Sequence, residues 1–239
     1  MSRFLLAAAL LCVSAAFAFD HTYAQYQTVL DKHVRDGSVN YSELLHDRAA
    51  LDSFVASCGE VTFEQYRAFT KNEKLAYLIN LYNAATMQLV IDHWPVASVQ
   101  DIGGLFSSPW NKKFIRMFDH MASLGMIEHD ILRADFDEPR IHFAIVCASR
   151  GCPLLRGDAY ADSKMRTQLA EQERGFLTAR PDCNRFENGT LYLSPIFKWY
   201  RPDFNNDDGI RTLLQLYYPE ITKTTRIEYT DYDWSLNGQ

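Results

Sequence analysis

The stretch that decides the fold is residues 70–95, TKNEKLAYLINLYNAATMQLVIDHWP. It opens on Thr70-x-x-Glu73, the spacing of a capping box in which side chain and backbone close a helix N-terminus. Apolar residues then recur at three- and four-residue intervals, which is the period of a helix face packed on a core. Pro95 ends the pattern, because the residue before a proline is pushed out of helical conformation. We therefore predict a long helix over Lys71 to about His93, at the centre of the fold.

Shorter patterns flank this helix on both sides. Residues 20–57 predict two helices about a turn at 36–38, and Thr62-x-x-Gln65 is a second capping box. Downstream, we predict helices over 124–134, from 163 to before Pro181, over 196–200 and over 209–218. We predict strands over Ile141–Cys147, 183–187, 190–194 and 226–229. Asn188-Gly189 is predicted to form the hairpin turn between two of these strands. Helices come first and a modest sheet follows, which favours the α+β class. We expect a single domain over residues 19–239, helix-rich in its N-terminal half, with a small, mainly antiparallel sheet from the C-terminal half.

Composition limits the classes of function. The chain has 239 residues, of which 47% are hydrophobic and 23% are charged, and its formal net charge is −6. These values are ordinary for a globular protein and exclude a disordered or disulfide-dense chain. An acidic protein lacks the basic field that nucleic acid and anionic membranes attract. We therefore expect a small molecule or a peptide as the partner, with no nucleic acid and no stable membrane insertion.

The first 18 residues have the pattern of a signal peptide. Arg3 gives a positive start, residues 4–16 are apolar, and Ala16-Phe17-Ala18 supplies the small residues that precede cleavage. The apolar run is shorter than the roughly 20 residues needed to span a bilayer. We predict an exported protein, in the bacterial periplasm or secreted; the alternative is a buried N-terminal helix.

Four cysteines follow that segment: Cys58, Cys147, Cys152 and Cys183. In an oxidising compartment their simplest interpretation is two disulfides, for which three pairings exist. The spacing of Cys147 and Cys152 suits either a small closed loop or two thiols brought to one site. The spacing alone does not choose between them.

Two polar pairs stand where helices are predicted. Asn80 and Asn83 share a face of the long helix, although asparagine is a poor residue for a helix interior. They indicate ligand contacts or hydrogen bonds to a neighbouring loop. Glu128 falls on an apolar stripe and His129 projects about 100° away from it. This pair suits general acid–base chemistry, or Glu128 forms a buried salt bridge.

The stretch 141–153, IHFAIVCASRGCP, carries the cysteines closest to this chemistry. A thiol at Cys147 or Cys152, activated by His129, would be a nucleophile, and loop N–H groups would stabilise an oxyanion. The competing interpretations are a Cys147–Cys152 disulfide and a zinc site that adds His129 and His142, whose spacing is not typical of zinc ligands. The aromatic stretches 197–204 and 229–234 indicate core packing, with Asp203 and Asp233 as caps.

Taken together, these stretches resemble the DUF547 family, a domain of unknown function found in exported bacterial proteins. The resemblance runs from about residue 24 to residue 237 and rests on separate motifs in the same order: DGSVNY (36–41), INLYNA (79–84), SL (123–124), IEH (127–129), ILR (131–133), PRIHFA (139–144), CAS (147–149), CP (152–153) and YDWSLN (232–237). Two acidic residues usual before the IEH run are replaced here by Gly125-Met126. Cys58 and Cys183 lie outside the family pattern, which makes them the better pair for a private disulfide and leaves Cys147 and Cys152 for the shared site.

Three hypotheses follow. The first is a thiol-dependent hydrolase or acyl transferase acting on an amide, peptide or thioester. Its predicted catalytic residues are Cys147, His129, Glu128 and Cys152, and Asn83 or a loop N–H would be the oxyanion donor. Its predicted substrate-binding residues are Asn80, Asn83, Arg133, Arg140 and Arg150. The second is a non-catalytic envelope binding module with a structural Cys147–Cys152 disulfide. The third is a metal-dependent enzyme. Neither a resident metal nor another cofactor is part of the first prediction.

Overall fold

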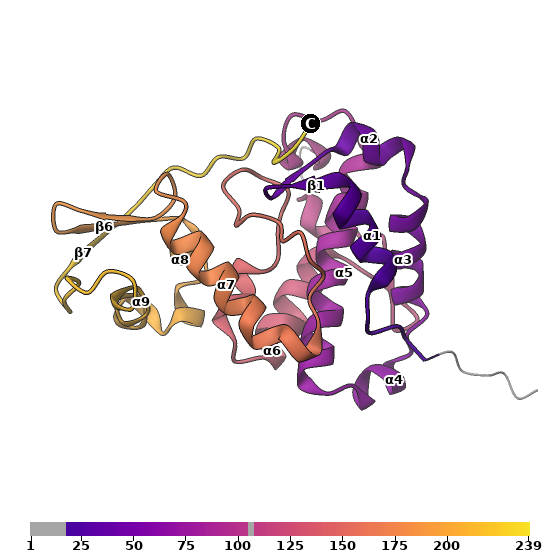
Figure 1. The fold of residues 1–239 in the computed structure, drawn as a ribbon, viewed down its shortest axis with the longest axis horizontal. Helices are drawn as coiled ribbons and strands as arrows, with labels where there is room; N and C mark the ends of the chain where they lie inside the picture. The colour runs from indigo at the N-terminus through magenta and orange to yellow at the C-terminus, as the bar shows by residue number, and fades with distance from the viewer. Residues whose placement is uncertain (1–17, 105–107) are drawn as a thin grey trace, which may run out of the picture.

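The central helix α5, Lys71–Ile91, organises the molecule. The computed structural model describes residues 18–104 and 108–239, so the predicted signal peptide lies almost wholly outside the described residues. Thr70 and Glu73 form the predicted capping box at the start of α5. Every residue from Leu75 to Ile91 except Gln88 is buried, because α3 (Ala49–Gly59) packs on one side of α5 and α7 (Met165–Thr178) lies on the other (Figure 1). The predicted central helix is confirmed.

Most of the remaining helices begin and end near their predicted bounds. The helices N-terminal to α5 are α1 (Ala24–His33), α2 (Tyr41–His46), α3 (Ala49–Gly59) and α4 (Phe63–Ala68), the last with the predicted capping box. Those that follow are η1 (Val99–Ile102), η2 (Pro109–Asn111), the π-helix η3 (Met126–Leu132), α6 (Arg133–Asp135), η4 (Pro139–Phe143), η5 (Asp162–Lys164), α7 (Met165–Thr178), α8 (Ile196–Trp199), η6 (Arg201–Phe204) and α9 (Asn206–Gln215). None of the helices in the described part of the chain is long and apolar enough to cross a membrane.

The strands are short and form three small sheets. Two are antiparallel hairpins, β1 (Val34–Arg35) with β2 (Ser38–Val39) and β3 (Ile115–Met117) with β4 (His120–Ala122). The third joins β5 (Arg185–Glu187), β6 (Thr190–Leu193) and β7 (Arg226–Tyr229), with β5 antiparallel and β7 parallel to β6. Asn188 and Gly189 both have positive φ, at 50° and 76°, as the predicted hairpin turn requires. The α+β class is confirmed.

One predicted strand is wrong. The run Ile141–Cys147 is not a strand: Pro139 opens the 3-10 helix η4, and an irregular loop follows it. A short apolar run with β-branched residues has the same sequence signature in a buried strand and in a buried helical turn. Here η4 packs on α7, so burial rather than pairing explains the apolar residues.

The C-terminal segment 230–239 returns across the molecule from β7 to the N-terminal half (Figure 1). It forms isolated bridges at three places, pairing Ser235 with Ser98, Leu236 with Ser149, and Gly238 with Val39. Residues far apart in sequence therefore meet along one line. This segment brings Tyr232 and Trp234 beside the loop that follows η4.

Candidate functional site

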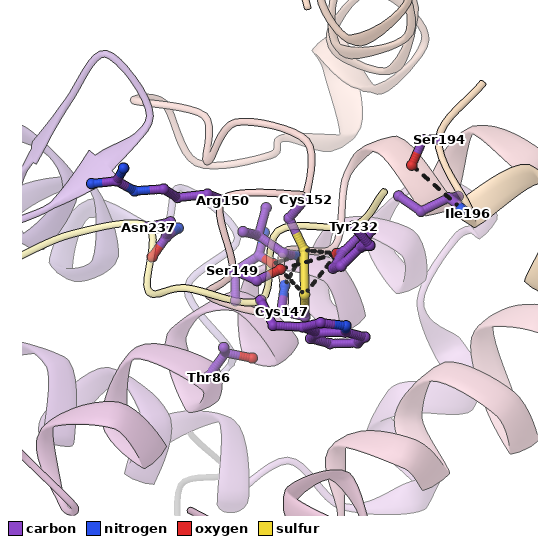
Figure 2. The surroundings of a disulfide bond; sticks show 12 residues. Thr86, Cys147, Ser149, Arg150, Cys152, Ser194, Ile196, Tyr232 and Asn237 are labelled. Atoms are coloured by element: carbon purple, nitrogen blue, oxygen red, sulfur yellow. Dashed lines mark hydrogen bonds between the residues drawn. A yellow bond between two sulfur atoms is a disulfide. The ribbon is translucent and has the colours of Figure 1, made fainter. Parts of the chain in front are cut away.

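A disulfide between Cys147 and Cys152 lies in the loop after η4 (Figure 2). The Tyr232 hydroxyl lies 3.3 Å from the Cys147 sulfur and 3.2 Å from the Cys152 sulfur, and it accepts a hydrogen bond from Ser149 Oγ at 3.0 Å. Inside the loop, Ala148 has a φ of 64°, a left-handed conformation that is uncommon for a residue with a side chain. The bridge thus closes a strained loop under a tyrosine ring.

Gly151 explains why Tyr232 fits so closely. A Cβ atom at this position would lie 2.9 Å from the Tyr232 ring, so only glycine leaves room for it. The Gly151 N–H donates to the Asp233 carbonyl at 2.8 Å, and the Arg150 N–H donates to the Ser235 carbonyl at 2.8 Å. The cysteine loop and the C-terminal segment are therefore fixed to each other by backbone bonds.

Glu128 is a buried carboxylate held by two tyrosines. Its side chain comes from the π-helix η3, a rare form that is frequent at functional sites. The hydroxyl of Tyr82 donates to Oε2 at 3.1 Å and that of Tyr200 donates to Oε1 at 2.5 Å. Burial, and then the nearby Glu128 charge, raises the pKa of both tyrosines, so both remain protonated donors. The partners of Glu128 are therefore tyrosine hydroxyls, whereas the alternative interpretation of this residue predicted a buried salt bridge.

His129 follows Glu128 in η3 but is exposed and has a different partner. Its Nδ1 atom lies 3.2 Å from Nη1 of Arg133. Because a guanidinium only donates, Nδ1 is the acceptor in this contact. Arg133 also donates to both carboxylate oxygens of Asp203, at 2.6 and 2.8 Å. Arg133, a predicted substrate-binding residue, is thus already paired.

His142 and Asp203 extend this network into the interior. His142 Nε2 lies 2.8 Å from Asp203 Oδ2, and its ring stacks on Tyr200 with 3.9 Å between centroids. The Arg133 hydrogen bond, reinforced by His142, lowers the pKa of Asp203 to about 2. Burial lowers the pKa of His142 and outweighs the opposing effect of the hydrogen bond that His142 donates to Asp203. A charged Asp203 therefore faces a neutral imidazole at neutral pH.

A cavity of about 470 Å³ joins these groups. The carboxylate of Glu128, both histidines and the disulfide lie in its lining together with six aromatic residues, namely Tyr82, Trp110, Trp199, Tyr200, Tyr232 and Trp234. Its volume is within the range of small-molecule sites. Cys147, Cys152, Glu128 and His129, the four predicted catalytic residues, thus share one cavity.

A second cavity, of about 660 Å³, shares part of its lining with the first. Cys152, Pro153 and Tyr232 line both cavities. Of the two, Arg150, a predicted substrate-binding residue, lines only the second, together with the free Cys183 thiol. Cys152 of the disulfide therefore borders both cavities.

The asparagines of α5 are not in either cavity. Asn80 donates to the Tyr160 carbonyl at 2.8 Å and accepts from the Tyr160 N–H at 2.9 Å. Asn83 bonds the Ala144 carbonyl and the Val146 N–H in the same way, at 3.0 and 2.8 Å. Both amides hold loops against α5, which agrees with the loop-bonding interpretation, and the Asn83 amide is not free to serve as an oxyanion donor.

The structure decides between the predicted cysteine pairings. Cys58 and Cys183 are free cysteines, so the predicted private disulfide between them is wrong. Cys147 and Cys152 form the disulfide that the alternative interpretation predicted, and they are not two free thiols. Arg140, a predicted substrate-binding residue, donates to Glu138 at 2.6 and 2.5 Å and does not line the cavity of about 470 Å³.

The predicted zinc alternative does not fit the geometry. Within residues 18–104 and 108–239, no three His, Cys, Asp or Glu side chains are placed to hold a metal ion. Both sulfurs of the proposed ligand set are used in the bridge, and His142 Nε2 faces Asp203.

Sequence reasoning missed the roles of Tyr200, Asp203 and Tyr232. Each lies in an aromatic-rich stretch that indicated core packing, and each meets its partner from a distant part of the chain. The only sequence signal was the unusual density of aromatic residues at 197–204 and 229–234.

Comparison with known proteins gives one match. Residues 66–177 match the model of a family described as "Protein of unknown function, DUF547". This range contains α5, Glu128, His142 and both bridged cysteines, whereas Tyr200 and Tyr232 lie beyond it. No curated protein and no solved structure matches the chain.

Proposed function

The chain belongs to the DUF547 family, whose function is unknown, and we propose that it is a binding module for a small organic molecule or a peptide end. The observation that carries this proposal is the disulfide in the wall of the cavity of about 470 Å³. With both sulfurs bonded and held by Tyr232, that cavity presents no free thiol for nucleophilic attack. It keeps the volume and the aromatic lining of a ligand site.

The bridge is tested by peptide mapping without reductant. Trypsin cuts after Arg140, Arg150 and Arg156, which places the two cysteines on the adjacent peptides 141–150 and 151–156. We expect these peptides to elute as one disulfide-linked species that gives two separate peptides after reduction. Recovery of both as alkylated single peptides from unreduced protein would remove the basis of the proposal.

Binding is tested by a compound panel read through tryptophan fluorescence, since three tryptophans line the cavity. The matched variant is Asn111→Trp, because Asn111 is exposed and lines the same cavity. We expect ligands that quench the wild-type signal to lose affinity in this variant while its melting temperature stays unchanged. Equal affinity in both proteins would place binding elsewhere.

A second candidate function is a thiol-dependent hydrolase or acyl transferase that acts after reduction. The observation that favours it is that Cys147 shares its cavity with Glu128 and His129. Iodoacetamide should then label Cys147 only after mild reduction, and the reduced protein should cleave a thioester that the oxidised protein leaves intact. This candidate fails if the reduced protein, not yet treated with iodoacetamide, cleaves no amide, peptide or thioester.

We also propose that the protein is exported, with residues 1–18 as the signal peptide, on the pattern of its first residues. N-terminal sequencing of the protein recovered from its native cells should begin at Phe19. Recovery with Met1 intact would contradict export by this route.

A further inference from the structure

The charges around the cavity of about 470 Å³ identify the kind of ligand it takes. Of its described lining residues, none is lysine or arginine, and Glu128 is the sole carboxylate. Both Glu128 oxygens accept from tyrosine hydroxyls, which orient the carboxylate without neutralising it. Hydrogen bonds from neutral donors leave a buried negative charge that attracts a positive group.

Both histidines in the lining already have polar partners. His129 Nδ1 lies 3.2 Å from Nη1 of Arg133. His142 is buried against Tyr200 and faces Asp203, whose charge Arg133 already pairs. Arg133 itself does not line the cavity. An anion entering here would face Glu128 with no lysine or arginine in the described lining to receive it.

The lining also contains a cluster of aromatic rings, here called the aromatic wall: Trp110, Trp199, Tyr232 and Trp234. Trp199 and Trp234 are stacked with 5.7 Å between centroids, Tyr232 lies 4.8 and 4.5 Å from them, and Trp110 lies 6.0 Å from Trp234. Trp199 is 44% exposed, an unusual position for a tryptophan. Aromatic faces carry negative electrostatic potential and attract cations, especially alkylated ammonium groups.

We propose that this cavity binds an organic cation, an ammonium group on a small apolar body, between the Trp199–Trp234 wall and the Glu128 carboxylate. This inference rests on the proposed binding function and names its ligand class. A neutral aromatic or sugar ligand would use the wall alone, and would leave the buried carboxylate without a counter-charge. A cation already lies over one aromatic ring of this lining, because Arg133 Cζ lies 5.1 Å from the centre of the Tyr200 ring.

The test compares three probes of one shape and different charge on oxidised protein: choline, its neutral isostere 3,3-dimethylbutan-1-ol, and the anion 3,3-dimethylbutanoate. Affinity is measured by calorimetry and tryptophan fluorescence. We expect choline to bind at least about tenfold more tightly than the neutral isostere, and the anion to bind more weakly than both, because loss of one buried charge contact costs a factor of ten or more.

Two variants assign the preference to its sources. Glu128→Gln should remove most of the preference for choline over its isostere and leave only the part due to the aromatic wall, while the control Glu187→Gln, at an exposed hairpin position, should leave the ratio unchanged. Trp199→Ala, at a position that is 44% exposed, should weaken choline binding about threefold. Trp199→Phe should restore part of the loss.

The outcomes separate the two proposals. If the neutral isostere or the anion binds as tightly as choline, the cation inference is overturned and the binding function stands. If the compound panel yields neutral ligands but no ammonium compound, the cation inference is likewise overturned and the binding function stands. If no compound of any charge binds, both proposals fail together.

Discussion

Replacing Asp203 with asparagine should destabilise the protein in a pH-dependent way. The pKa of Asp203 is lowered from 3.8 to about 2, first by the hydrogen bonds from Arg133 and then by His142. Because the folded pKa lies below the unfolded value, the stabilisation is present above about pH 4 and is lost as pH falls towards 2. The shift corresponds to about 2 kcal/mol at neutral pH and to roughly half of that at pH 3. The Asp203 side chain is 21% exposed, so solvent screens the pair only partly.

The assay is urea unfolding of oxidised wild-type protein and Asp203→Asn, followed by circular dichroism at pH 7 and pH 3. We expect the difference in unfolding free energy to be about 2 kcal/mol at pH 7 and to shrink by about half at pH 3. Asp207→Asn is the control: Asp207 pairs with Arg201, which is 48% exposed, so its loss should cost under about 1 kcal/mol at either pH. A difference for Asp203→Asn that is equal at both pH values would refute the reasoning.

Three other substitutions or treatments test the framework of the site. Asn80→Ala should lower the unfolding free energy by about 3 kcal/mol, because it leaves the buried backbone N–H and C=O of Tyr160 without partners; a loss below 1 kcal/mol in urea would contradict this. Reduction of the disulfide, which closes a loop with a sequence separation of 5, should cost about 2 kcal/mol, measured by the same method with and without reductant. Gly151→Ala should displace the Tyr232 ring and cost about 1–3 kcal/mol; an unchanged crystal position of Tyr232 would show that the contact tolerates a side chain.

The sequence predicts the parts of this fold that local chemistry determines. The capping box at Thr70 and Glu73 and the turn at Asn188-Gly189 lie where predicted, because each depends only on residues within a few positions. The strand predicted over Ile141–Cys147 is wrong because strand pairing depends on distant residues. Its apolar residues report burial, and whether a buried segment pairs as a strand is decided by neighbours that the segment does not contain.

In the candidate site too, the sequence predicts a feature that local residues determine and misses the distant partners. Glu128 stands out in the sequence because it interrupts an apolar stripe, and the structure confirms that it is buried. Its partners, Tyr82 and Tyr200, lie 46 and 72 residues away, and no spacing rule connects them. The resemblance favoured a Cys58–Cys183 disulfide and left Cys147 and Cys152 for the shared site, with their own disulfide as the alternative. Folding instead leaves Cys58 and Cys183 as free thiols.

The disulfide and the aromatic wall depend on one another. Tyr232 touches both sulfurs, and its ring lies 4.5 Å from that of Trp234, so the position of the wall follows the position of the bridge. Reducing the bridge would therefore free the thiols of both Cys147 and Cys152 and release Tyr232 from its contacts with the bonded sulfurs. If both functions proposed above hold, ligand binding belongs to the oxidised protein and thiol chemistry to the reduced protein, because the bridge cannot be closed and open at once.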